Sequence, residues 1–97
     1  MKVGNTAIDL RSYDVRVEGE KITFSPKEVE ILHLMASQLG QVFTREQLLD
    51  SIWGFDFDGD SRVVDTSVKR IRKKLPPTSS LSIVSVYGVG YKAEGTV

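Results

Sequence analysis

Apolar residues recur along this chain with two different periods, and each period predicts a different kind of element. Between residues 62 and 75 they lie three or four positions apart, which places them on one side of a helix. They are Val64, Val68, Ile71 and Leu75. The polar residues that project from the opposite side are Arg62, Thr66, Lys69, Arg70 and Lys73. The pattern predicts an amphipathic helix over 62–75 with one apolar and one basic side.

Two helices are predicted before this one, because each begins with a capping box. Ser25 and Glu28 form the first box, Pro26 suits the first helical position, and Gly40 is a typical helix end. The side predicted to be buried consists of Val29, Leu32, Met35, Ala36 and Leu39, widened by Ile31 and Leu34. After a short connection, a second box of the same kind predicts a helix over 44–53.

Alternation of apolar and polar residues predicts strands near both ends of the chain. Within residues 6–24 the alternating pairs are Ile8 and Leu10, Val15 and Val17, and Ile22 and Phe24. Turn-like breaks separate the pairs, so we expect a small antiparallel sheet. After Pro76–Pro77, a β-rich run and a glycine-rich turn predict a hairpin over 82–94. Residues 1–97 are therefore expected to form one α+β domain with an N-terminal antiparallel sheet, three helices and a C-terminal hairpin.

Basic residues are concentrated in the helix predicted over 62–75, although the chain as a whole is neutral. The chain has 13 basic and 13 acidic residues, and six of the basic ones lie in this helix beside a single acid, Asp65. Its net charge is +5, and that of the remaining residues is −5. For an isolated helix, a solvated basic side is the simpler explanation. The flanking helices and hairpin favour DNA binding instead, because a helix about 10–12 Å across fits the major groove, which is about 12 Å wide.

The basic side of this helix carries donors of two kinds. Arg70 is the best candidate for a guanine edge, because its planar guanidinium can donate to two acceptors at once. Thr66 lies at the centre of the side and is expected to meet a base edge or a thymine methyl group. Lys69 and Lys73 are expected to contact phosphates. Asp65 leaves two alternatives open, which are orienting a neighbouring Arg or Lys and contacting a base.

The composition argues against other classes of function. There is no cysteine, the only histidine is His33, and no phosphate-binding loop is present, so neither an enzyme nor a cofactor or metal site is expected. Counted from Asp56, a calcium loop needs glycine and glutamate where the chain has Ser61 and Ser67. No apolar run approaches the roughly 20 residues that cross a bilayer, so we expect a cytoplasmic protein without a membrane partner.

Four stretches of the chain, taken together and in this order, resemble a known family. They are FSPKEVEIL at 24–32, TREQLLDSIW at 44–53, RVVDTSVKRIRKKL at 62–75 and VYGVGY at 86–91. Nearly the whole chain resembles the winged-helix DNA-binding domain of OmpR/PhoB-type response regulators. The resemblance implies a winged helix-turn-helix with a four-stranded N-terminal sheet, a recognition helix over 62–75 in the major groove and a wing over 82–94. It also implies sequence-specific promoter binding, usually by two copies on tandem direct repeats.

The resemblance also implies which residues bind DNA. In the recognition helix these are Arg62, Thr66, Ser67, Lys69, Arg70 and Arg72. Trp53 matches a tryptophan that touches phosphate, and Ser85 and Tyr91 match wing residues that contact the DNA backbone. For Trp53 and Tyr91, packing in the core is an equally weighted alternative. The loop over 54–61 lies where such proteins engage RNA polymerase, and its aspartates suit that contact.

Two features set this chain apart from the usual pattern of the family. Tyr87 stands where arginine often precedes the Gly-x-Gly turn, and Val89 stands where threonine is common, so minor-groove contact by a wing arginine is not expected.

The receiver domain through which a sensor kinase acts is absent, so a fragment of a longer regulator is expected. A protein-interaction module that binds polymerase or a membrane-linked sensor is the alternative. The Lys and Arg residues on the outer side of 62–75 argue against it.

Overall fold

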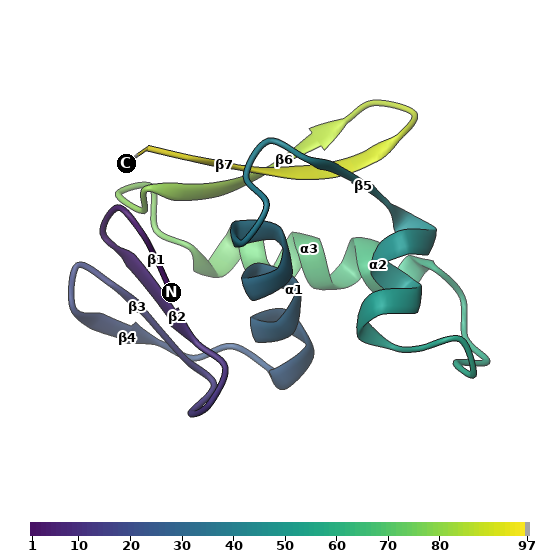
Figure 1. Cartoon of the computed structure of the whole chain (residues 1–97), viewed down its shortest axis with the longest axis horizontal. Helices are drawn as coiled ribbons and strands as arrows, with labels where there is room; N and C mark the ends of the chain where they lie inside the picture. The colour runs from purple at the N-terminus through teal and green to yellow at the C-terminus, as the bar shows by residue number, and fades with distance from the viewer. Residues whose placement is uncertain (97) are drawn as a thin grey trace.

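The chain begins with a four-stranded antiparallel sheet, as the resemblance implies, whereas the alternation predicts an antiparallel sheet with three of these strands. The computed structural model describes residues 1–96. The strands are β1 (Lys2–Val3), β2 (Thr6–Asp9), β3 (Asp14–Val17) and β4 (Glu20–Ile22), and they are hydrogen-bonded in that order (Figure 1). Val3, Ile8, Val15 and Val17 are buried, while their strand neighbours are more exposed. The sheet therefore has one side toward the core and one toward solvent.

The predicted strand pairs were wrong at two residues and missed one strand. Leu10 lies in a turn and is exposed, because the Asp9 carboxylate accepts a hydrogen bond from the backbone N–H of Arg11 at 2.8 Å and bends the chain. Phe24 is buried, but it lies beyond the end of β4. β1 has only two residues, too few for a period to be visible.

Three helices follow, and both predicted capping boxes are present. They are α1 (Pro26–Ala36), α2 (Arg45–Ile52) and α3 (Arg62–Lys74). The prediction that α1 extends to Leu39 was wrong, and Leu39 is exposed. The Ser37 hydroxyl donates to the Leu34 carbonyl at 2.6 Å, and residues 37–40 form turns instead. Gly40 still serves as the break, with φ of +84° and its N–H bonded to the carbonyl of Ala93.

The predicted hairpin is part of a second sheet with three strands. β5 (Val42–Thr44) pairs with β7 (Gly90–Gly95), which pairs with β6 (Leu81–Val86). β5 was not predicted, and it turns the connection between α1 and α2 into a strand. Gly90 is required at this crossing, because a Cβ there would lie 2.0 Å from the carbonyl oxygen of Phe43. The second sheet fixes the hairpin to the helical part of the molecule (Figure 1).

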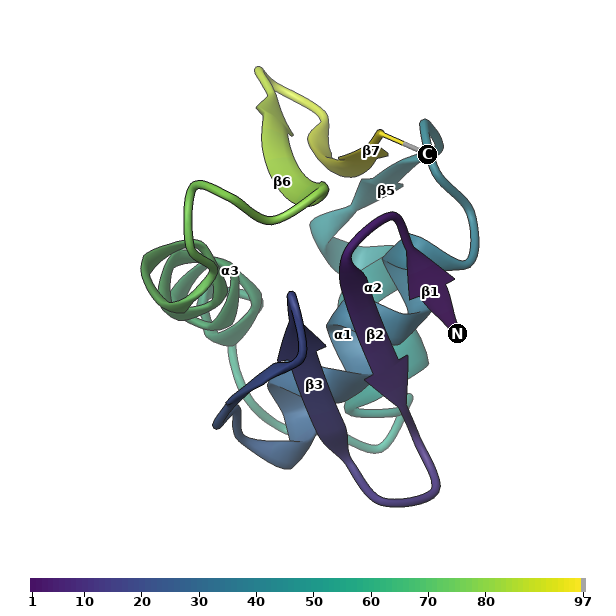
Figure 2. The same cartoon turned by 90° about the vertical axis from the view of Figure 1, so that its left-hand side faces the viewer.

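The three helices and both sheets share one core. Figure 2 shows α1 behind the N-terminal sheet, α3 to one side, and the three-stranded sheet above them. Val64, Val68 and Ile71 of α3 are buried as predicted, whereas Leu75 is only half-buried, because α3 ends at Lys74. No helix among residues 1–96 is long and apolar enough to span a membrane. The core thus holds α3 by one side and leaves its other side exposed.

Candidate nucleic-acid interface

The exposed side of α3 carries the basic residues that the pattern predicts. Arg62, Thr66, Lys69, Arg70 and Lys73 are all exposed. Lys69, Arg70 and Lys73 take part in none of the ion pairs found among residues 1–96. The last turn of α3 contains three basic residues, whose charge is favourable at the negative end of the helix dipole. Lys69, Arg70 and Lys73 are thus positioned by the helix alone and are able to meet an anion.

Arg62 is held at the first turn of α3 by Asp60. The Asp60 carboxylate accepts from the backbone N–H of Arg62 at 3.0 Å and from its Nε at 3.1 Å. The backbone hydrogen bond and the guanidinium of Arg62 lower the pKa of Asp60. Ser61, at the N-cap position, makes no side-chain capping bond. Because Arg62 remains largely exposed, it can exchange this carboxylate for a phosphate.

The structure brings three of the predicted residues, Arg72, Ser85 and Tyr91, together between α3 and the hairpin. Arg72 donates through Nε to the Ile83 carbonyl at 2.9 Å and through Nη2 to Ser85 Oγ at 2.8 Å. Its guanidinium also lies 5.4 Å from the centre of the Tyr91 ring, within cation–π range. Arg72 therefore joins α3 to β6 and β7, and two of its N–H groups are already engaged within the protein.

Asp65, whose role the sequence leaves open, accepts hydrogen bonds from two other elements. Arg45 at the start of α2 donates to Oδ2 at 2.6 Å, and the Tyr91 hydroxyl on β7 donates to Oδ1 at 2.5 Å. The hydrogen bond and charge of Asp65 raise the pKa of Arg45. Burial, followed by the hydrogen bond to Asp65, raises the pKa of Tyr91. Asp65 thus orients an arginine, which is one of its two predicted alternatives.

Arg45 is a residue that sequence reasoning missed. It follows the N-cap Thr44, and that position explains its place in α2 but not its partner. Asp65 lies 20 residues later in the chain, and no period relates the two. The only sign in the sequence that Arg45 has such a partner is that a basic residue stands at the first position of α2. It is also unusual there, because the positive end of the helix dipole favours acids.

Ser67 and Trp53 lie apart from this cluster. Ser67 is half-buried on α3, on the flank away from Asp65 and Arg72 at 100° per residue. Trp53 is partly buried against the core at the C-cap of α2, with Lys27 Nζ 5.9 Å from its ring centre and the Phe57 ring at 6.1 Å. Trp53 therefore contributes to packing, which was one of its two predicted roles.

The tip of the hairpin is apolar. Tyr87 is 100% exposed and Val89 51% exposed, and Gly88 between them has φ of +75°. An open groove lies beside the tip and is lined by Arg45, Glu46, Asp65 and residues 85–91. The groove runs from the N-terminus of α2 to the hairpin, and Asp65 is the residue of α3 that lines it.

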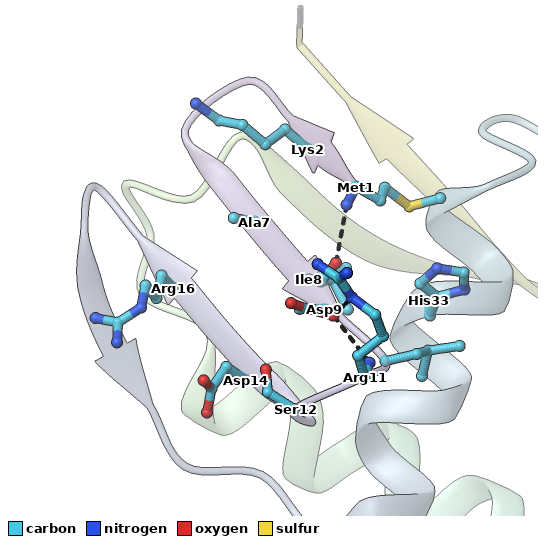
Figure 3. A pocket seen from close by; sticks show the side chains of 11 residues that line it. Met1, Lys2, Ala7, Ile8, Asp9, Arg11, Ser12, Asp14, Arg16 and His33 are labelled. Atoms are coloured by element: carbon cyan, nitrogen blue, oxygen red, sulfur yellow. Dashed lines mark hydrogen bonds and ion pairs between the residues drawn. The ribbon is translucent and has the colours of Figure 1, made fainter.

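A second pocket lies at the other end of the molecule, over the N-terminal sheet, with His33 of α1 at its edge (Figure 3). Its ionisable lining residues are Lys2, Asp9, Arg11, Asp14, Arg16 and His33, together with the N-terminal ammonium of Met1, which donates to the Ile8 carbonyl at 3.1 Å. Among the described residues, no group of three or more His, Cys, Asp or Glu is placed to hold a metal ion. None of the predicted DNA-binding residues lines this pocket.

Comparison with known proteins gives a family match. Residues 19–93 match the family model described as transcriptional regulatory protein, C terminal. The heme response regulator HssR of Staphylococcus aureus is 38% identical over 98 residues, which cover 100% of this chain and 44% of HssR. This chain therefore spans less than half the length of the curated relatives that it matches.

Two solved structures illustrate the structural likeness. The response regulator DrrB of Thermotoga maritima, an OmpR/PhoB homologue, has a TM-score of 0.83 at 38% identity, covering 98% of this chain and 44% of DrrB. The DNA-binding domain of RstA from Klebsiella pneumoniae, solved in complex with the RstA box, has a TM-score of 0.82 at 31% identity. That match covers 97% of this chain and 95% of the RstA domain.

Proposed function

The chain belongs to the family of C-terminal domains of transcriptional regulatory proteins, of the OmpR/PhoB type, and from this premise we propose that it binds double-stranded promoter DNA sequence-specifically. It acts as the effector part of a two-component regulator. The proposal agrees with the winged-helix fold and with the RstA domain, which was solved with its DNA box.

One observation carries the proposal. α3 buries Val64, Val68 and Ile71 and exposes Arg62, Thr66, Lys69, Arg70 and Lys73 on its other side. A helix that is held to the core on one side and basic on the other can enter the major groove without losing its own packing. The hairpin beside it, with Ser85 exposed on β6, suits contacts to the flanking sugar-phosphate backbone.

The side chains divide into base-reading and backbone-contacting groups. Arg70 and Thr66 are assigned to base edges, because the guanidinium donates to two acceptors and the threonine is small. The residues assigned to phosphates or to either class are Arg62, Ser67, Lys69, Arg72, Lys73, Trp53 and Ser85. Tyr91 is the remaining backbone contact that the resemblance implies, and its hydroxyl reaches a phosphate only if it leaves the Asp65 carboxylate. Ser85 accepts from Arg72, so its own hydroxyl hydrogen remains able to donate to a phosphate.

Protein partners are proposed from position in the fold. The loop over 54–61 extends from the end of α2, and its exposed Phe55 and its aspartates suit a contact with RNA polymerase. Three further points follow from the family. The target is a pair of tandem direct repeats, a receiver domain carries the input from a sensor kinase, and the location is cytoplasmic. They belong to the same proposal for the longer regulator.

The second candidate function is protein binding by the hairpin. It is favoured by Tyr87 and Val89, which are more exposed and more apolar than a grip on phosphate requires. The exposed side of α3 carries no comparable apolar anchor and is basic. DNA binding therefore remains the better supported function.

Selection of duplexes from a random pool by the purified chain tests the proposal. We expect a common sequence motif to emerge, and fluorescence anisotropy to give tighter binding to the selected duplex than to a scrambled one. Specific complexes usually exceed non-specific ones by about 10³-fold or more. Equal binding to selected and scrambled duplexes would contradict sequence-specific recognition. Retention of RNA polymerase without any DNA binding would favour the protein-binding alternative.

A further inference from the structure

Four residues connect α3 to both strands of the hairpin, and we call them the wing clamp. They are Asp65 and Arg72 on α3, Ser85 on β6 and Tyr91 on β7. Residues 65 and 72 are seven positions apart, so their side chains leave the helix within about 20° of each other. Ser85 and Tyr91 are direct partners in the pairing of β6 with β7. Asp65 accepts from Tyr91, and Arg72 donates to Ser85 and lies over the Tyr91 ring. One flank of α3 therefore holds both strands of the hairpin at the same level.

Arg45 extends the wing clamp to α2. Its guanidinium donates to Asp65 Oδ2, while Tyr91 occupies the other carboxylate oxygen. The Asp65 side chain is 35% exposed, so water screens this carboxylate only partly. Through Asp65, α2, α3 and β7 are joined at a single carboxylate. These are the elements that flank the groove beside the exposed side of α3.

The Tyr91 hydroxyl can donate only one hydrogen bond at a time. It has one hydrogen, and that hydrogen is donated to Asp65 at 2.5 Å. The hydroxyl is protonated at neutral pH, and burial together with the hydrogen bond to Asp65 raises the pKa of Tyr91 further above its usual range. A phosphate oxygen only accepts hydrogen bonds, so Tyr91 cannot donate to DNA while this bond holds. Asp65 and a DNA phosphate therefore compete for the same hydrogen.

A carboxylate at this place is unfavourable for direct DNA binding. Asp65 lies on the helix with the basic side, where its charge repels the phosphates that Lys69 and Lys73 are proposed to contact. Its ion pair with Arg45 offsets this charge but also engages that arginine within the protein. Any favourable effect of Asp65 on DNA affinity must therefore come from its hydrogen bonds with Tyr91 and Arg45 inside the protein.

We propose that Asp65 is a positioning residue, which sets the orientation of the hairpin and α2 relative to α3 and thereby the DNA specificity of the interface. This inference rests on the proposed function. The recognition helix and the wing contact neighbouring parts of one duplex, so both contact it together only when their relative orientation matches the groove. Asp65 acts through Tyr91 and Arg45 and does not itself touch the DNA.

Asp65→Asn tests the positioning role by whether it strengthens or weakens binding to DNA. If the charge of Asp65 alone mattered, its removal would strengthen binding to every duplex. The wing clamp predicts instead that binding to the selected duplex weakens by about tenfold, because a hydrogen bond to a charged group is lost. Binding to scrambled DNA should be unchanged or stronger. Asp50→Asn is the matched control, because it removes one charge from an exposed site on α2 and should leave the ratio of the two affinities unchanged.

Tyr91→Phe and the double variant decide how Tyr91 acts. Tyr91→Phe removes one oxygen without changing charge, and it should also weaken binding to the selected duplex. Both substitutions act on the Asp65–Tyr91 bond, because Asn keeps one acceptor atom where Asp65 serves two donors, so the double variant should be weakened by clearly less than the product of the two single effects. If Tyr91 donates to phosphate independently, the two effects should multiply, and the inference is overturned.

Two further outcomes separate this inference from the proposed function. A gain of affinity for both duplexes in Asp65→Asn, equal to that of Asp50→Asn, would overturn the positioning role while leaving DNA recognition intact. A wild-type chain with no preference for any duplex would overturn the proposed function itself. Thermal unfolding of each variant shows that it is folded at the assay temperature. If Asp65→Asn is not folded there, Tyr91→Phe alone decides the matter by the ratio of its two affinities.

Discussion

Arg70 and Lys69 are neighbours on the exposed side of α3, and they differ in what their head groups can recognise. The guanidinium of Arg70 presents donors in a planar fork that matches the O6 and N7 acceptors of guanine. The ammonium of Lys69 is a point charge that suits a phosphate in any sequence. Neither takes part in an ion pair among the described residues, so replacement removes no such contact within the protein. This pair therefore gives a clean comparison.

Arg70→Ala is expected to weaken binding to the selected duplex by about 1–3 kcal/mol and to relax the preference at one base pair. Lys69→Ala is expected to weaken binding to selected and scrambled duplexes alike. Anisotropy titrations with single-base variants of the selected duplex measure both effects. An equal loss on both kinds of duplex for Arg70→Ala would show that Arg70 contacts the backbone rather than a base.

At the scale of elements, the first turn of α1 is tied to the last turn of α3. The Glu28 carboxylate, only 3% exposed, accepts from Lys74 Nζ at 2.8 Å and from the backbone N–H of Ser25 at 2.9 Å. Lys74 also lies 5.3 Å from the centre of the Phe24 ring. Burial raises the pKa of Glu28, but the hydrogen bonds from Lys74 and Ser25 outweigh it, so the pKa is lowered overall.

This contact predicts how stability depends on pH. Because the pKa of Glu28 is lower in the folded state, its ionised form stabilises the fold above the unfolded-state pKa of about 4.3, and this stabilisation is lost as pH falls through the folded-state pKa. Glu28→Gln keeps an acceptor for Ser25 but removes the charge. We expect it to lower the free energy of unfolding by about 1–2 kcal/mol at neutral pH and by less in acid.

Urea unfolding of Glu28→Gln between about pH 3 and pH 7 measures this difference. Glu20→Gln is the control, because Glu20 is exposed on β4 and takes part in none of the ion pairs among residues 1–96. An equal destabilisation of Glu28→Gln at every pH would show that shape, rather than charge, is what Glu28 contributes.

At the scale of the whole molecule, the separation of charge matters more than its sum. The chain is neutral, so its net charge would not attract DNA. The basic residues concentrated on α3 create a local positive field, while the loop over 54–61 contains three aspartates and no basic residue. This asymmetry is expected to orient the molecule as it approaches a duplex.

Binding should therefore depend steeply on salt. If about three to five phosphates are neutralised per chain, the logarithm of the affinity should fall against the logarithm of salt concentration with a slope of about −2.7 to −4.5. Lys73→Ala should reduce the size of the slope by about one. Lys2→Ala, an exposed lysine on β1, should not change it. A slope near zero would rule out phosphate contacts as the main source of affinity.

The helices and their polarity could be predicted from the sequence, because their determinants are local. A capping box spans four residues, and both boxes are present in the structure as predicted. The period of Val64, Val68 and Ile71 decides which side of α3 is buried. The same period places Arg70 and Lys73 on the exposed side. The basic side of the candidate interface was thus encoded within one stretch of chain.

The partners of the polar side chains were decided only by the tertiary structure. The Asp65–Tyr91 bond joins residues 26 positions apart, Arg45–Asp65 joins residues 20 apart, and Lys74–Glu28 joins residues 46 apart. The third strand, β5, exists because β7 pairs with it. A period records which side of an element a residue occupies but not which element packs there. The fold therefore determines how the basic helix is held against the hairpin, because that arrangement depends on contacts between distant residues.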